Sequence, residues 1–185
     1  MANTVIPIKS KENINTIKKI LTPRDRLMFI MGINSALRVS DLLPLTVGDV
    51  RDKNGKLKTE IVLREHKTGK EKRFPINDAI SKELNNFLKH DWPDDRPLFK
   101  SRKSEESITR KQAHQIISKA GAQIGLNNIG THSMRKTFGY HAYIQSGGNL
   151  GLVQKLLNHS SSSDTIRYIG IEQEEMNAVY LKLNL

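Results

Sequence analysis

The stretch Thr131–Gly139, which reads THSMRKTFG, predicts the helix around which the rest of the chain is arranged. Thr131 is a good N-cap residue, and the spacing after it predicts a helix from His132 to about Gln145. His132 and Arg135 then lie one turn apart on the same side of that helix. The first turn of a helix also offers free N–H groups and a partial positive charge, so these residues outline an anion site. A solvated surface pair is the alternative interpretation, and the remaining sequence must decide between the two.

The composition favours a polyanionic partner. Lys and Arg total 30 against 19 Asp and Glu, a formal net charge of +11, and nucleic acid is the leading candidate for such a basic chain. Aromatic residues make up only 5% of the chain, which favours contact with duplex DNA over stacking on single strands. The lack of cysteine excludes disulfides, thiolate metal sites and cysteine nucleophiles.

The length and the first residues predict one intracellular domain. A chain of 185 residues is long enough to bury a core, and we expect residues 1–185 to form a single domain. The first ten residues lack the apolar run of a signal peptide, and no stretch approaches the length of a membrane span. We therefore expect a soluble, cytoplasmic protein.

Two helices are predicted before the first candidate site residue. Isoleucines at helical spacing predict an amphipathic helix over residues 10–21, and a Thr-Pro pair predicts the start of a buried helix over residues 24–37. Arg38 follows directly, either as a structural arginine that binds loop carbonyls or as a phosphate ligand. Ser40 is placed to cap a short helix that Pro44 limits.

Residues 57–76 predict a small antiparallel sheet. An Asn-Gly turn signal precedes them, and residues 57–63 and 71–76 alternate between apolar and polar side chains, so two to three strands are expected. Lys67 lies in or beside the turn. Three further basic residues follow it on the next strand: Lys70, Lys72 and Arg73. This pattern indicates either a solvated basic hairpin or a lysine-bearing arm that enters a DNA groove.

After the predicted sheet, the sequence predicts four more helices besides the one at Thr131. They are expected over residues 77–89, 110–121, 150–157 and 172–185. Arg110 and Lys111 begin the second of these, which fits a helix-turn-helix reader only loosely. His159 directly follows the third, where the helix dipole favours a protonated imidazole. Tyr168 lies nine residues further on.

Five of these segments together resemble the catalytic domain of the tyrosine recombinase (phage integrase) family, in its order and with its spacings. They are ALRVSDL, HKTGKEKR, THSMRKTFG, LLNHS and RYI, which span residues 36–169. The resemblance implies an α+β, mainly α-helical domain with a small antiparallel sheet near residues 57–76. Most relatives carry an N-terminal DNA-clamping domain, which is not expected here.

The resemblance also implies how a phosphodiester would be cut. Tyr168 would attack DNA to form a 3′-phosphotyrosine and free a 5′-hydroxyl, without a metal or other cofactor. Arg38 and Arg135 would hold the non-bridging oxygens in bidentate fashion. His159 would donate a hydrogen bond to the phosphate. The energy of the broken bond is kept in the covalent intermediate for rejoining.

Two further residues would move protons in this scheme. A phenol has a pKa of about 10, so Tyr168 needs a partner to take its proton, and His132 is placed for that role. Lys67 would protonate the leaving 5′-oxygen. Two positions depart from the family pattern: Asp41 replaces the usual glutamate and is expected to support Arg38, and Asn158 replaces a glycine at a position where Asn tolerates positive φ.

Several expectations concern partners. Double-stranded DNA is the expected substrate, and the chain is expected to form a homo-oligomer, from dimer to tetramer, on DNA through its C-terminal helix. Six basic residues outside the catalytic set are candidate DNA contacts: Lys70, Lys72, Arg73, Arg110, Lys111 and Lys136.

Two alternative functions stay open at this point. One is a DNA-binding regulator or remnant that keeps the fold without recombining, and the other is a type IB topoisomerase-like relaxase. A metal-dependent nuclease is disfavoured because the histidines lack carboxylates at ligand spacing.

Overall fold

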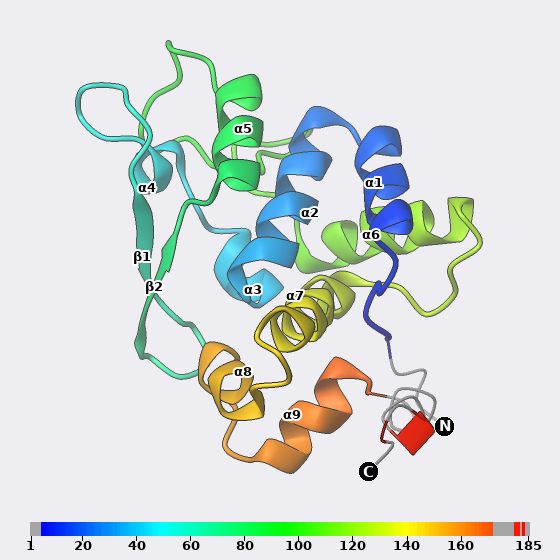
Figure 1. Cartoon of the computed structure of the whole chain (residues 1–185). Helices are drawn as coiled ribbons and strands as arrows, with labels where there is room; N and C mark the ends of the chain where they lie inside the picture. The colour runs from blue at the N-terminus through cyan, green and yellow to red at the C-terminus, as the bar shows by residue number, and fades with distance from the viewer. Residues whose placement is uncertain (1–4, 172–179, 182, 184–185) are drawn as a thin grey trace.

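The computed structural model describes residues 5–171, 180, 181 and 183. It is mainly helical with one two-stranded sheet, as the sequence predicts (Figure 1). Its elements in order are α1 (Lys11–Ile20), α2 (Pro23–Ser35), α3 (Val39–Leu42), α4 (Val47–Val50), β1 (Glu60–Arg64), β2 (Glu71–Pro75), α5 (Asp78–Phe87), α6 (Arg110–Gln123), α7 (Thr131–Gln145), α8 (Leu150–Leu156) and α9 (Ser162–Ile169). None of the helices in the described part of the chain has the length and apolar character that a membrane span requires.

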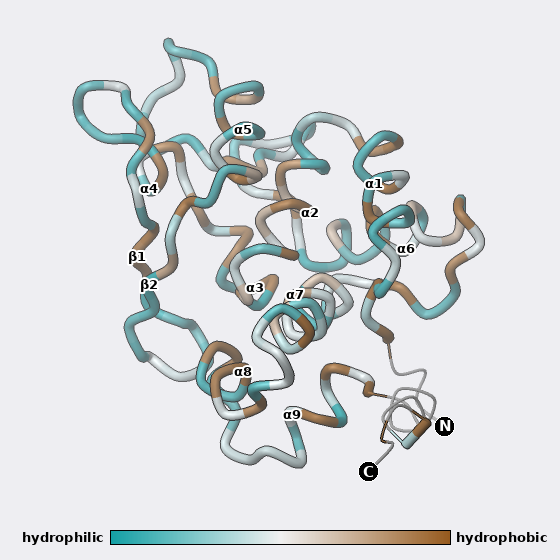
Figure 2. Tube along the Cα trace, in the orientation of Figure 1, coloured by the Kyte–Doolittle hydropathy of each residue, from teal (hydrophilic) through white to brown (hydrophobic). Residues whose placement is uncertain are grey.

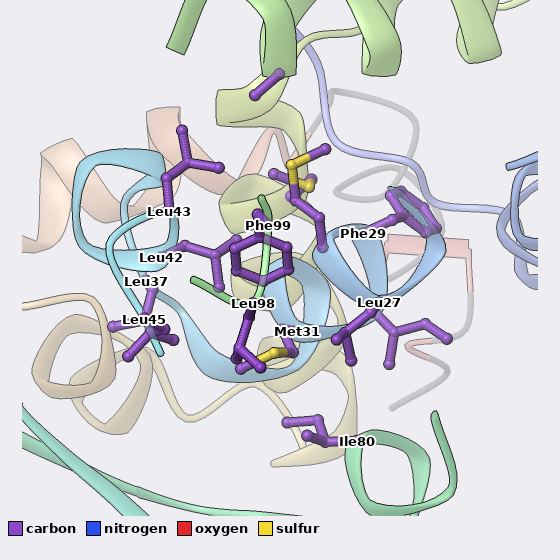
Figure 3. Packing of buried hydrophobic residues seen from close by; sticks show 14 of the residues in the cluster. Leu27, Phe29, Met31, Leu37, Leu42, Leu43, Leu45, Ile80, Leu98 and Phe99 are labelled. Carbon is purple, nitrogen blue, oxygen red and sulfur yellow. The ribbon is translucent and has the colours of Figure 1, made fainter. Parts of the chain in front are cut away.

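Helix α2 lies at the centre of the main hydrophobic core. Its apolar side chains are buried on most sides and pack with residues from the α3 region, α5 and the segment before α6 (Figure 3). Pro23 occupies the first turn as predicted, whereas Thr22 donates its hydroxyl hydrogen bond to Asp25 Oδ2 at 2.8 Å. The helix ends at Ser35, two residues earlier than predicted, because Ala36 adopts the left-handed conformation with φ 56°. This turn places Arg38 at the edge of the core.

The sheet consists of β1 and β2, paired antiparallel from Glu60 opposite Pro75 to Arg64 opposite Glu71. The possible third strand is reduced to a single bridge between Arg51 and Leu57. Hydrophilic residues follow one another along the turn between the strands, which comes down beside α8 (Figure 2). The hairpin packs by one face, where Ile61 and Phe74 are buried opposite each other, and extends a polar turn towards α8.

The predicted caps of α5 and α6 are confirmed. The side chain of Asn77 accepts from the Ile80 N–H at 3.0 Å, and the Thr109 hydroxyl accepts from the Gln112 N–H at 3.2 Å. At α7 the prediction was wrong by one residue: Gly130 is the N-cap, and its N–H donates to Ser133 Oγ at 3.1 Å. Thr131 is thus the first residue of α7.

Three short helices differ from the sequence prediction. Helix α3 starts behind Arg38 rather than Ser40, because the Arg38 carbonyl accepts the first helical hydrogen bonds. Helix α4 was not predicted; the Asp49 carboxylate accepts from the Thr46 N–H at 2.8 Å and closes its first turn. Helix α9 was not predicted either; Ser161 caps it by accepting from the Asp164 N–H at 3.1 Å.

Helix α7 joins two hydrophobic clusters. Met134 lies in the main core, whereas Phe138 packs against a second, smaller cluster under α8 and α9. The buried members of the second cluster are Ala36, Val153, Leu157 and Ile169. The expected single core face of α7 is therefore divided between the body of the domain and the two helices that carry the C-terminal site residues.

The helix predicted over residues 172–185 lies outside the described residues, apart from 180, 181 and 183. Tyr180, interpreted from its apolar surroundings as a core or interface residue, is 76% exposed. The core interpretation of this tyrosine is therefore wrong.

Gly139 on α7 allows α9 to pack closely, and its replacement tests that contact. A Cβ at this position would lie 2.8 Å from Ile169 Cγ2 and 3.1 Å from Leu157 Cδ1. We expect Gly139→Ala to lower the free energy of unfolding by about 1–3 kcal/mol through overpacking. The measurement is urea unfolding followed by circular dichroism.

Gly151→Ala on α8 is the matched control. The nearest atom to its added Cβ would be Asn149 Oδ1 at 3.8 Å, so the change should be neutral or slightly stabilising. Equal losses in both variants would contradict the close packing of α7 and α9.

Candidate active site

One cleft gathers all the side chains that the sequence singled out for chemistry. It has a volume of about 760 Å³ and is lined by residues of the α2–α3 junction, the β1–β2 turn, the start of α7 and the α8–α9 segment. Its lining includes Arg38, Lys67, His132, Arg135, His159 and Tyr168. These residues come from distant parts of the sequence, so only the fold brings them together.

Arg135 is the most deeply placed cation of the cleft. It is 2% exposed, and its guanidinium donates through Nη1 to the Ala36 carbonyl and through Nη2 to the Leu157 carbonyl. These carbonyls lie at the C-terminal ends of α2 and α8. Burial lowers the pKa of Arg135, as does the nearby charge of Arg38. Arg135 thereby ties three helices together while it faces the cleft.

Arg38 pairs with Glu65, a residue that sequence reasoning missed. Arg38 Nη1 lies 3.1 Å from Glu65 Oε1, and the Glu65 side chain is completely buried. The other carboxylate oxygen of Glu65 accepts from Thr68 Oγ1 at 2.8 Å and from Asn158 Nδ2 at 3.1 Å. Burial acts to raise the pKa of Glu65, but these hydrogen bonds together with Arg38 and Lys72 outweigh it, and the pKa is lowered. Glu65 is therefore an ionised brace beneath the site.

Asp41, expected to support Arg38, is placed differently. Its Oδ1 accepts from the backbone N–H of His66 at 2.9 Å, which anchors the start of the β1–β2 turn. The signal that could have identified Glu65 was its position at the end of an alternating strand, immediately before the basic turn. The shorter side chain of Asp41 therefore binds the backbone of the turn, and Glu65 forms the ion pair with Arg38.

Lys67 and Lys72 lie at different depths although both were assigned to one basic hairpin. Lys67 lies in the exposed turn and lines the cleft. Lys72 points inward, and its Nζ donates to the Ala36 carbonyl at 3.2 Å and to the Leu156 carbonyl at 3.3 Å. Burial, together with Arg135 and Arg38, lowers the pKa of Lys72 to about 8 against the opposing effect of Glu65. Lys72 thus shares the Ala36 carbonyl with Arg135.

The other candidate DNA contacts also differ in their surroundings. Lys70, Arg110 and Lys111 are exposed. Arg73 is exposed but lies within 3.2 Å of Glu60 and 2.9 Å of Glu71. Lys136 is 8% exposed, lines the cleft, and places its Nζ 5.2 Å from the centroid of the Tyr168 ring.

His132 lies in the first turn of α7 and remains partly exposed. Partial burial lowers the pKa of its imidazole, and the charges of Arg135, Lys136 and Arg38 act in the same direction. A histidine with a pKa below its ordinary value is neutral at pH 7 and has a lone pair that can accept a proton.

The side chains of His159 and Tyr168 are in contact with each other. Asn158 adopts φ 49°, the conformation expected for this position, and the turn brings His159 towards α9. The His159 and Tyr168 rings make an edge contact with centroids 4.8 Å apart. Burial raises the pKa of the Tyr168 hydroxyl, although Arg135 acts in the opposite direction.

The expectation that a helix dipole favours protonated His159 is wrong for this structure. Burial lowers the pKa of its imidazole, and Arg135 and Arg38 lower it further. Burial is the main cause of this lowering, and the positive charges across the cleft act in the same direction. No group of three or more metal-ligating side chains occurs within the described ranges.

Comparison with known proteins places this geometry in a family. The sequence matches the model of the phage integrase family over residues 9–175. The chain belongs to this family, the tyrosine recombinases. A relative from Bacillus subtilis (strain 168), described as a probable integrase/recombinase YoeC, is 44% identical over 179 residues, which cover 95% of each chain.

Two solved structures show the same fold. The crystal structure of XerA recombinase has a TM-score of 0.74 at 19% identity and covers 97% of this chain and 65% of that one. The XerH recombinase, in a post-cleavage complex with its palindromic difH substrate, has a TM-score of 0.73 at 20% identity and covers 97% of this chain and 52% of that one. The tyrosine recombinase fold expected from the sequence is confirmed, and the chain spans only part of these two proteins.

Replacing Glu65 tests its role as the buried brace of this recombinase site. We expect Glu65→Gln to lower the free energy of unfolding by about 1–3 kcal/mol, because it weakens charge-assisted hydrogen bonds and leaves Arg38 without a counter-charge. Glu60→Gln is the matched control on the same hairpin, since the exposed pair with Arg73 contributes about 0–1 kcal/mol. Urea unfolding measures both, and an equal effect would contradict the assignment.

The two cleft histidines predict a loss of stability in mild acid. Their pKa values are lowered in the folded protein. Below about pH 6.5 the unfolded chain therefore binds more protons than the folded one. As a result, the free energy of unfolding decreases as the pH is lowered. The double variant His132→Gln/His159→Gln should show a shallower fall between about pH 7.5 and 5.5. Unfolding at several pH values checks this, and parallel slopes would refute it.

Proposed function

We propose that this chain is a site-specific DNA recombinase that cleaves and rejoins strands through a 3′-phosphotyrosine at Tyr168. The observation that carries the proposal is the convergence of a partly buried tyrosine, two arginines, two histidines and a lysine on one cleft. A phenol is weakly nucleophilic at neutral pH, and the neighbouring cations supply the environment that a phosphoryl transfer requires.

The proposed first step begins with a phosphodiester held by Arg38 and Arg135. Tyr168 Oη attacks phosphorus while His132 takes the phenolic proton, and the bond from phosphorus to the 5′-oxygen breaks. Lys67 gives its proton to that oxygen, so a 5′-hydroxyl leaves and the 3′-phosphate remains on the tyrosine. A second 5′-hydroxyl reverses the step and rejoins the strand. The scheme uses no metal ion, because both proton transfers are made by side chains.

The arginines contribute most in the crowded transition state. Both lie in the cleft before any substrate is present, and the Arg135 fork is oriented by two backbone carbonyls. Preorganised donors of this kind contribute about 10²–10³ in rate each. Glu65 holds Arg38 in the same way, through its hydrogen-bonded carboxylate.

The proposed substrate is double-stranded DNA. The net charge of +11 supports binding to its backbone. The structure of XerH is that of a complex with its difH substrate, and we extend DNA cleavage to this chain on the basis of the shared family and site. We also propose that copies assemble on DNA through residues 172–185, and that the protein acts in the cytoplasm.

The non-catalytic alternative has no specific observation in its favour. A regulator that only binds DNA has no need for a tyrosine packed between an imidazole ring and a lysine ammonium at the bottom of a cationic cleft. A topoisomerase-like relaxase would share the first step and differ in its product, relaxed circles without strand exchange.

A suicide DNA substrate tests the proposed function. A duplex taken from the DNA flanking the gene is nicked near the candidate cleavage site, so that the short 5′-hydroxyl fragment diffuses away and the covalent complex accumulates. We expect a protein–DNA band on a denaturing gel in the presence of EDTA, and its loss in Tyr168→Phe.

Tyr143→Phe is the matched control, because Tyr143 lies on α7, packs against the second cluster and does not line the cleft. A band that persists in Tyr168→Phe would contradict the assignment of the nucleophile. If the protein binds DNA but forms no covalent protein–DNA band with any duplex taken from the flanking DNA, the non-catalytic alternative would be favoured.

A further inference from the structure

Thr165 lies directly behind His159 and contacts two groups with its single hydroxyl. Thr165 Oγ1 is 3.0 Å from the Ser161 carbonyl oxygen, one turn earlier in α9, and 3.2 Å from His159 Nδ1. The residue is completely buried. Its hydroxyl is therefore held by these protein partners.

The number of available protons decides the direction of both hydrogen bonds. A threonine hydroxyl has one proton to donate, and a carbonyl oxygen can only accept. If Thr165 donates to Ser161, as threonines in helices commonly do one turn back, its lone pairs face His159 and Nδ1 must be the donor. If Thr165 instead donates to Nδ1, two oxygen lone pairs oppose each other at 3.0 Å inside the protein. Only the first arrangement satisfies both contacts.

We infer that Thr165 holds His159 in the tautomer with its proton on Nδ1, so that Nε2 faces the cleft bare and donates to a phosphate only after binding a second proton. Thr165 is on this account a positioning residue that acts through His159. The inference rests on the proposed function for the identity of the anion, but the tautomer itself is a property of the free protein.

The charges around His159 keep that second proton away until an anion arrives. Arg135 of α7 and Arg38 before α3 face it as cations, whereas Asp164 of α9 is the opposing acid. Tyr168 contributes a neutral ring. The other titratable side chains of the same cleft are Lys67, His132, Lys136 and Arg167. With cations in the majority, burial and repulsion lower the pKa of His159 in the free protein.

A bound phosphate reverses this balance. An anion within hydrogen-bonding distance of an imidazole typically raises its pKa by about 1–3 units. DNA binding would then be accompanied by uptake of a proton at His159, and the imidazolium would donate from Nδ1 to Thr165 and from Nε2 to the phosphate. The protonated side chain appears only where a phosphate occupies the cleft, and it then adds a donor to those of the arginines.

The tautomer can be read from the free, full-length protein by nuclear magnetic resonance with ¹⁵N-labelled histidine, assigned by comparison with His159→Gln. We expect His159 at pH 7.5 to show a protonated Nδ1 and a bare Nε2. Thr165→Ser should keep this pattern, because serine retains the hydroxyl. Thr165→Val should lose it, with Nδ1 no longer held as the donor. A protonated Nε2 in the wild type would overturn the inference, even if Thr165→Val fails to fold.

Inorganic phosphate is the probe for the second half of the inference. We expect saturating phosphate to raise the pKa of His159 by about one unit or more, at concentrations that also shift the side-chain resonances of Arg135. An unmoved His159 pKa at concentrations that shift Arg135 would overturn the coupling while leaving the proposed function intact. Phosphate that shifts neither residue would contradict the phosphate site, and with it both the coupling and the proposed function, whereas the tautomer of the free protein still decides the role of Thr165.

Discussion

The structure depends on one side chain, the guanidinium of Arg135. It donates to the carbonyls of Ala36 and Leu157, at the ends of α2 and α8. The segment that follows the first carbonyl carries Arg38, and the segment that follows the second carries His159. Arg135 therefore fixes the positions of its own partners in the cleft. A lysine could not replace it, because a point charge lacks the planar fork that reaches two carbonyls and still faces the substrate.

The cleft concentrates positive charge, and the carboxylate of Glu65 offsets part of this charge. Glu65 is buried beneath Arg38 and receives hydrogen bonds from Thr68 and Asn158, so its charge compensates the arginine from the side away from the cleft. Lys72 adds a further cation behind the site, because its pKa of about 8 leaves it mostly protonated at pH 7, and it binds two carbonyl oxygens. The remaining cations lower the pKa values of the two histidines. A phosphate would supply the missing negative charge, and the free site is organised to receive it.

The elements with strong local signals were predictable from sequence. The caps at Asn77 and Thr109, the proline at the start of α2 and the alternating strands all depend on neighbours within four residues. The family motifs also predicted which side chains meet in the cleft, since each motif carries one or two of them. The role of each residue in the reaction stays a prediction.

The sequence-based predictions were wrong or incomplete where contacts between distant segments determine the position of a residue. Asp41 is near Arg38 in the chain, but Glu65 reaches the arginine across the fold, and the position of Glu65 at the end of a strand does not by itself show which arginine it meets. In the sequence, Lys72 cannot be distinguished from the exposed basic residues beside it; in the structure, it lies against α8. Helix α9 was not predicted; besides its local cap at Ser161, it is held by Ile169 packing against Gly139, a contact between segments thirty positions apart.

Peptide mapping of the covalent protein–DNA complex shows whether Tyr168 is the residue that becomes bonded to DNA. After nuclease digestion, trypsin would cut behind Arg167 and Lys182 and release the peptide of residues 168–182, which contains both Tyr168 and Tyr180. Fragmentation of this peptide in the mass spectrometer distinguishes the two tyrosines. We expect a nucleotide linked through phosphate to Tyr168. A nucleotide on Tyr180, on another tyrosine or on a serine of the Ser160–Ser163 run would contradict it.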